Sequence, residues 1–131
     1  MIYAVIDTNV IVSSLLSIFP DSATVLVREA ISKKIVTPLY NEEILAEYRT
    51  VLSRSKFDFP SGLIESLLEM IVEGGVLTGK TPSNEQFLDK SDTVFYEVCL
   101  SREGSYLVTG NKKHFPAKPF VVSPAELINM V

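Results

Sequence analysis

Residues 2–6, IYAVI, form a nearly unbroken apolar run, and this run constrains the fold more than any other feature of the chain. Strands of this composition are typical of the interior of a parallel sheet, because both of their faces are covered. Further segments have the composition of short strands: 35–38, 76–79, 105–110 and 120–123. We expect the strand at 35–38 to stop at Pro38, because proline donates no hydrogen bond to a neighbouring strand.

The segments between these strands have helical spacing or capping residues. The most regular is 42–54, where apolar side chains recur in steps of three and four after Asn41, a good helix cap. Other helices are predicted at 10–17, 23–34, 62–75, 92–100 and 124–131, with a polar loop at 80–91 and a short polar turn or helix at 111–115. Strands that alternate with helices predict an α/β fold with a central, mostly parallel sheet, and we expect one domain over residues 1–131.

Composition narrows the setting in which the chain works. No stretch approaches the roughly 20 apolar residues of a membrane span, the N-terminus lacks the pattern of a signal peptide, and Cys99 has no partner for a disulfide. We therefore expect a cytoplasmic protein without a membrane segment. The net charge of −4 is not that of a general nucleic-acid binder, yet it leaves a nucleic-acid enzyme open, because bound metal ions reverse the local sign.

Polar side chains follow two of the predicted strands. Asp7 comes directly after the first strand, and Thr109 to Asn111 follow the apolar residues of the strand at 105–108. In open parallel sheets, ligands bind outside the carboxyl ends of the strands, so we expect both groups at the functional edge. Asp92 begins a helix after the long polar loop, and that loop can bring it to the same edge.

The predicted helix at 42–54 carries two glutamates one turn apart. Glu47 adjoins the apolar stripe and is expected to reach inward, whereas Glu43 is expected on the solvated face. For the aspartates a purely structural role is the alternative: Asp7 and Asp92 as helix caps, and Asp89 as an acid of the loop.

Several acids without a nucleophilic cysteine indicate chemistry of hard cations. The only histidine is His114, in a lysine-rich turn, where we expect an inert surface residue, with phosphate contact as the alternative. Acids that share one cleft repel each other unless cations occupy it, and Mg²⁺ and Mn²⁺ prefer oxygen ligands. The acids therefore predict a divalent metal site suited to phosphodiester hydrolysis.

Four segments resemble, in order and spacing, the motifs of PIN-domain proteins: IDTNVIVSSLL, PLYNEEILAEYRTVLSR, FLDKSDTVFYEVCL and YLVTGNKKHF. The chain is most similar to the bacterial and archaeal group described as toxins of toxin–antitoxin systems. The resemblance implies a three-layer α/β/α sandwich with a central parallel sheet. It also implies a ribonuclease that uses Mg²⁺ or Mn²⁺, acts on RNA and is inhibited by a cognate antitoxin protein.

Carried over residue by residue, the resemblance implies that Asp7, Glu47 and Asp92 are the metal ligands and catalytic residues. The fourth acid of the family usually follows the Thr-Gly of the late strand, and here that position is Asn111. Its amide oxygen can ligate a metal or position water, but it brings no charge. Asp89 is expected to compensate in part as a further ligand.

Contacts to substrate are expected from polar and basic residues around these acids. Thr8 and Asn9 match the family's polar positions after the first acid, and they could also cap the first helix in place of Asp7. Three basic residues are expected to steady the RNA backbone, and Thr109 to orient water or phosphate. The expected substrate-binding set is Thr8, Asn9, Arg54, Thr109, Lys112 and Lys113.

Two other functions are alternatives. The replacement by Asn111 favours a catalytically weakened module that binds RNA or protein. A signalling domain with a phospho-accepting acid fits less well, because it needs an acidic pair before the acceptor strand, whereas the acids here are scattered over two helix starts and one helix body. The apolar helix at 62–75 could pack against another subunit in a homodimer, although packing in the core explains it as well.

Overall fold

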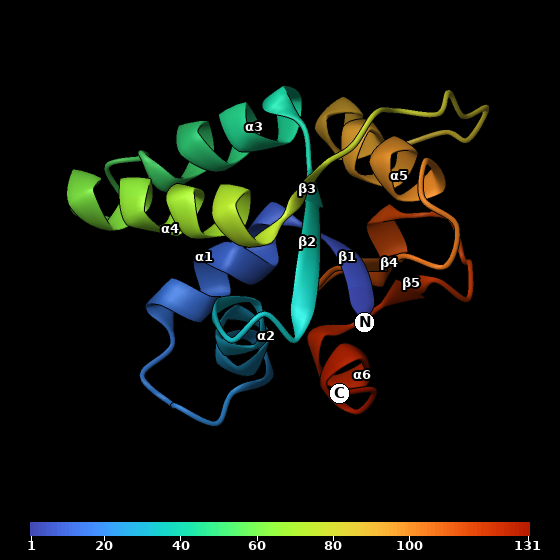
Figure 1. Ribbon diagram of the computed structural model, residues 1–131. Coiled ribbons are helices and arrows are strands. Elements are labelled where there is room, and N and C mark those ends of the chain that lie inside the picture. The colour runs from blue at the N-terminus through green and yellow to red at the C-terminus, as the bar shows by residue number, and fades with distance from the viewer.

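A computed structural model describes residues 1–131, and its centre is a sheet of five parallel strands flanked by helices (Figure 1). The strands lie in the order β3-β2-β1-β4-β5. Along the chain the elements are β1 (Ile2–Ile6), α1 (Thr8–Leu16), α2 (Ala23–Ser32), β2 (Val36–Tyr40), α3 (Glu42–Leu52), α4 (Ser61–Gly74), β3 (Val76–Leu77), the 3-10 turn η1 (Lys90–Asp92), α5 (Thr93–Leu100), β4 (Tyr106–Val108), the 3-10 turn η2 (Lys112–His114), β5 (Val121–Val122) and α6 (Pro124–Ile128).

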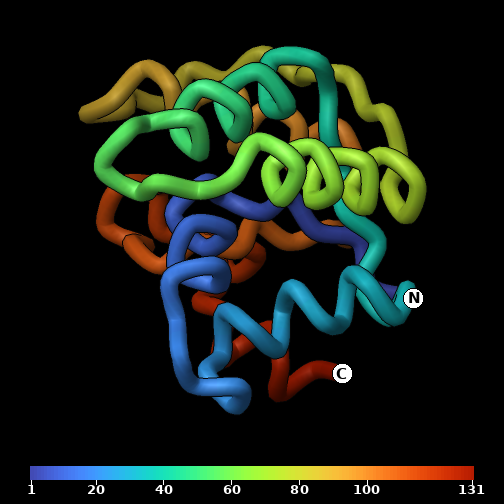
Figure 2. Tube along the Cα trace, turned by 90° about the vertical axis from the view of Figure 1, so that its left-hand side faces the viewer, coloured from blue at the N-terminus to red at the C-terminus, as the bar shows by residue number.

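Helices cover both faces of the sheet, so the fold is the three-layer α/β/α sandwich that the sequence predicts. Helix α5 packs against β2, β1 and β4, while α2 and α4 contact β2 from the side that also holds α1. Figure 2 is turned toward that second side, where α1, α2 and α4 lie in front of the strands. No helix combines the length and the apolar character that crossing a membrane requires.

Strand β1 occupies the middle of the sheet and pairs with β2 on one edge and β4 on the other. Ala4, Val5 and Ile6 are buried, as expected for a strand that is covered on both faces. The backbone N–H of Asp7 still donates to the carbonyl of Val108 at 2.9 Å, so the ladder between β1 and β4 extends to the first residue after β1.

The prediction that the second strand stops at Pro38 is wrong. Strand β2 runs through Pro38 to Tyr40, with Pro38 in register with Ala4 of β1. Pairing of β2 with β3 begins only at Leu39, so the missing N–H of Pro38 falls where that ladder is incomplete, and proline is tolerated there.

The other ends of helices and strands differ from the predicted ones by one to three residues. Helix α2 ends at Ser32 rather than Lys34, because Lys34 takes a left-handed backbone conformation with φ of 62°. Strand β4 ends at Val108 rather than Gly110, because the N–H of Gly110 donates to the side chain of Asn9 at 3.2 Å instead of to a strand. Helix α1 begins at Thr8, two residues earlier than expected, and this shift decides which residue stands at its cap.

Candidate functional site

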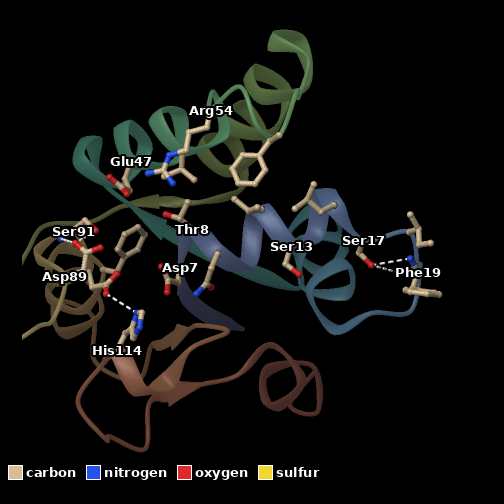
Figure 3. Close-up of a pocket in the computed structure, with 18 residues that line it drawn as sticks. Asp7, Thr8, Ser13, Ser17, Phe19, Glu47, Arg54, Asp89, Ser91 and His114 are labelled. Atoms are coloured by element: carbon tan, nitrogen blue, oxygen red, sulfur yellow. Dashed lines mark hydrogen bonds and ion pairs between the residues drawn. The ribbon is translucent and has the colours of Figure 1, made fainter.

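A pocket of about 720 Å³ opens at the carboxyl ends of β1 and β4 (Figure 3). It contains the four acids Asp7, Glu47, Asp89 and Asp92, and one arginine, Arg54. Figure 3 shows the acids with His114 at one end of the pocket and Phe19 at the other. The remaining residues of the wall are Thr8, Asn9, Val12, Ser13, Leu16, Ser17, Ile18, Val51, Phe57, Ser91 and Phe95.

Asp7 stands at the N-cap of α1, yet its side chain makes no capping hydrogen bond. Its Oδ2 instead accepts a hydrogen bond of 2.7 Å from the hydroxyl of Thr109, and only 6% of the residue is exposed. Burial raises the pKa of Asp7, the hydrogen bond from Thr109 counteracts this, and the charge of Glu47 adds to the increase. Thr8 and Asn9 lie inside α1, so neither of them replaces Asp7 as the helix cap. The side chain of Asp7 does not cap the helix, and it bonds Thr109 instead.

Asp92 likewise precedes a helix, α5, without capping it. Its side chain is 13% exposed, and Oδ2 is buried without a hydrogen-bond partner. Nδ1 of His114 lies 3.7 Å from that oxygen. Burial, then the charges of Asp7 and Asp89, raise the pKa of Asp92 to about 6. A buried carboxylate oxygen without a partner is costly, and a nearby cation would lower that cost.

The two glutamates of α3 separate as predicted. Glu47 is half-buried and lines the pocket, whereas Glu43 is exposed and its Oε1 lies 2.7 Å from Nζ of Lys80. The buried hydroxyl of Tyr48, next to Glu47, donates to the carbonyl of Ile6. This bond ties α3 to the last residue of β1, and it holds Glu47 close to Asp7.

Asp89 is an exposed acid with local partners. Its Oδ1 accepts hydrogen bonds from the N–H and the hydroxyl of Ser91, at 3.0 Å and 2.8 Å, and these bonds lower its pKa. Asp89 therefore organises the turn η1, which ends at Asp92, and Asp89 also lines the pocket.

Thr109 and Asn111 lie outside the pocket wall and form hydrogen bonds to residues that line it. Thr109 is fully buried, so it positions Asp7 and does not present a surface for substrate. Its hydroxyl oxygen also accepts a hydrogen bond of 3.0 Å from the N–H of Asn111. The side chain of Asn111 lies 3.0 Å from Nε2 of His114, outside the pocket wall.

The three basic residues that were expected to contact the RNA backbone lie in different places. Arg54 lines the pocket close to Glu47, and none of the ion pairs of the protein involves it (Figure 3). Lys112 is outside the pocket and its Nζ lies 2.9 Å from Oε1 of Glu126 in α6. Lys113 borders a different surface depression. The structure therefore brings one of the three expected cations to the acids.

His114 is the residue that sequence reasoning undervalued, because the structure places it in the pocket rather than on an inert surface. It follows Asn111 by three residues, and this spacing returns its ring toward the pocket through the 3-10 turn η2. The apolar part of the wall, with Phe19 and Phe57, was also missed. Neither aromatic has a sequence signal that separates it from a core residue.

The donor set fits a hard divalent cation. No group of three or more His, Cys, Asp and Glu side chains lies close enough together to enclose an ion. Mg²⁺, however, is usually held by one or two carboxylates and keeps several waters. The buried, unpartnered oxygen of Asp92 and its charge repulsion with Asp7 favour such an ion in this pocket.

Comparison with known families gives one match. A sequence model described as the PIN domain matches residues 3–113, which include every acid of the pocket, and His114 is the first residue after the match. No curated protein and no solved structure matches the chain.

Proposed function

This chain belongs to the PIN domain family, and from that premise we propose that it is a ribonuclease that hydrolyses RNA phosphodiesters with Mg²⁺ or Mn²⁺. PIN domains are generally nucleases and use divalent metal ions, so the fold is of a nuclease type. We further propose that residues 1–131 act as a single domain, because β5 and α6 extend the same sheet and core beyond the matched residues.

One observation carries the proposal: the buried Oδ2 of Asp92 has no hydrogen-bond partner and lines the same pocket as Asp7 and Glu47. An isolated acid of this kind is normally protonated or paired. Here the neighbouring acids raise its pKa further, and the only imidazole nearby is 3.7 Å away. A divalent cation between these carboxylates would remove that electrostatic penalty.

Asp7 and Asp92 would hold the metal, and Glu47 would bind it through water or complete a second, weaker site. A bound ion of this kind supplies an activated water and stabilises the negative charge that develops on the phosphate. Thr109 fixes the carboxylate of Asp7, since its hydroxyl occupies Oδ2 and leaves Oδ1 for the pocket.

Two further residues act on the substrate side of the pocket. Arg54 places a guanidinium where a phosphate of the RNA backbone would be neutralised by bidentate hydrogen bonds. His114 faces Asp92 through Nδ1. Because the amide nitrogen of Asn111 donates to Nε2, the proton of a neutral imidazole is held on Nδ1, toward Asp92.

The likeness of the motifs to toxins supports a toxin role within a toxin–antitoxin pair. The second candidate is a module of the same fold that binds RNA or protein and has little or no hydrolytic activity. Asn111 favours this alternative, because it brings no charge and its side chain bonds His114 instead of lining the pocket.

Digestion of single-stranded RNA tests the proposal. We expect cleavage with Mn²⁺ or Mg²⁺, none with a chelator, and a loss of at least about 100-fold in Asp7→Asn, as removal of a key electrostatic group usually costs. Asp21→Asn changes an exposed acid outside the pocket and is the matched control. Cleavage that persists in Asp7→Asn would indicate a contaminating nuclease. If the parent protein binds RNA but does not cleave it, the binding module is favoured.

A further inference from the structure

The pocket has two chemically different ends. Asp7, Glu47 and Asp89 lie at one end, and Phe19 lies at the other (Figure 3). Ile18, the neighbour of Phe19 in sequence, also lines the pocket. Ile18 is 85% exposed and Phe19 is 63% exposed. Apolar side chains that gather so openly at the rim of a hydrolytic pocket mark a binding surface more often than an accident of packing.

One face of α1 connects the two ends. Thr8, Val12 and Leu16 are spaced by four residues and therefore lie in one row along the helix, and all three line the pocket. Asp7 precedes this row, and Phe19 follows it. The pocket therefore runs along α1 from the acids to the aromatic end.

Another wall of the pocket comes from the segment after α3. Phe57 lines the pocket, and its ring stacks on Phe59 with centroids 5.4 Å apart and planes 14° apart. Nζ of Lys56 lies 5.1 Å from the centroid of the Phe57 ring. With Arg54 on the same segment, this wall combines aromatic rings and cations.

Aromatic planes interleaved with cations form the surface on which single-stranded nucleic acids bind, because bases stack on the rings and phosphates pair with the cations. Bases of a duplex are stacked on each other and are not available for such contacts. An apolar peptide would use the rings but would leave the guanidinium of Arg54 without an anion. The mixture therefore favours a single strand as the occupant.

We propose that the RNA strand lies along α1, with the scissile phosphate at the acids, a neighbouring phosphate at Arg54 and a base stacked on the exposed ring of Phe19. This inference rests on the proposed ribonuclease function and names a residue that contacts a nucleotide near the cut. It makes Phe19 a residue that determines which nucleotide near the cleavage site is preferred.

The length of α1 sets the position of that base. Its 9 residues span about 13 Å at 1.5 Å per residue. Stacked nucleotides rise about 3.4 Å each, so Phe19 lies within about four nucleotides of the scissile phosphate. The preferred base is therefore expected close to the cut, on one side of it only.

Fluorescence anisotropy with a labelled single-stranded RNA and Mg²⁺ tests the proposal, in the Asp7→Asn background to prevent cleavage. We expect Phe19→Ala and Phe19→Leu to weaken binding about 5- to 150-fold, as loss of a stacked base does, and Phe19→Tyr to retain it. Leu77→Ala is the matched control, because Leu77 is 67% exposed and lies outside the pocket. The leucine variant separates stacking from simple apolar contact.

Abasic substitution of the RNA locates the contact. At one position within about four nucleotides of the cut, the abasic RNA and Phe19→Ala should together weaken binding no more than either alone. Additive losses at every position, or a Phe19→Ala effect no larger than that of Leu77→Ala, would overturn the inference while RNA cleavage that needs Asp7 still stands. If Phe19→Ala instead abolishes only self-association in light scattering, the occupant is a second copy and the inference is wrong. Failure of every variant to bind RNA would overturn both proposals.

Discussion

The hydroxyl of Thr109 donates a 2.7 Å hydrogen bond to Oδ2 of Asp7 across 102 residues of sequence, inside the core. Thr109→Val keeps the shape of the side chain but leaves a buried carboxylate oxygen without its donor. We expect a loss of about 1–3 kcal/mol in the free energy of unfolding at pH 8, measured by urea denaturation. Thr109→Ser retains the hydroxyl and is the control. A loss in Thr109→Ser as large as that in Thr109→Val would show that the hydrogen bond to Asp7 is not the source of the stability.

Asp92 should make the metal-free protein less stable as the pH rises. Its pKa is raised from 3.8 to about 6 in the folded state, so its contribution to stability is present below about pH 4 and is lost as the pH rises through 6. In the presence of a chelator, Asp92→Asn is therefore expected to be more stable than the parent at pH 8. The gain is on the order of 1–2 kcal/mol, because a tenfold change in proton affinity corresponds to about 1.4 kcal/mol and solvent screens part of it.

The difference between Asp92→Asn and the parent should vanish at pH 4, where the parent carboxyl is already neutral. Thermal unfolding at both pH values measures this, with Asp21→Asn, which changes an exposed acid outside the pocket, as the control. A variant that is less stable than the parent at pH 8 would show that the carboxylate has a favourable partner even without metal.

Divalent ions should stabilise the parent protein and bind less tightly to variants of the pocket. At an ion concentration 100 times the dissociation constant, the gain is about 2.7 kcal/mol. Glu47→Gln and Glu43→Gln change the same residue type one turn apart on α3, but only Glu47 lines the acid pocket. We expect calorimetric titration with Mn²⁺ to give weaker binding for Glu47→Gln and unchanged binding for Glu43→Gln. The reverse order would place the ion on the other side of α3.

Gly75 should tolerate no side chain. A Cβ there would lie 2.5 Å from the carbonyl oxygen of Pro38 and 2.4 Å from that of Ile71, both of which are backbone atoms. We expect Gly75→Ala to cost roughly 1–3 kcal/mol or more in urea unfolding, as overpacking does. Gly62 in α4 has open space around its Cα, so Gly62→Ala should stabilise by up to about 1 kcal/mol. Similar effects of the two substitutions would contradict this account.

Features that depend on neighbours in sequence could be predicted. The apolar run at 2–6 indicates a central strand because burial on both faces requires it, and Asn41 caps α3 through a 2.8 Å bond to the N–H of Ile44, as its position indicates. The inward position of Glu47 could be predicted as well, because Glu47 adjoins the apolar stripe of α3. Each of these predictions depends only on residues close together in sequence.

Features set by distant partners could not be predicted. Pro38 remains in a strand because of where β3 begins, and Lys112 is removed from the acids by Glu126, fourteen residues later. The approach of His114 to Asp92, at 3.7 Å, joins two segments that are distant in sequence, so it could not be predicted either. The metal-binding, catalytic and substrate-binding roles of the site residues remain predictions.

The strand order also determines when the pocket can form during synthesis of the chain. Strand β1 is made first but is placed in the middle of the sheet, and its partner β4 is made about a hundred residues later. Asp7 therefore leaves the ribosome long before Thr109 and His114 exist. Folding that depends on contacts so distant in sequence is slow to begin. A nascent chain is thus without an assembled pocket until nearly all of it has been translated.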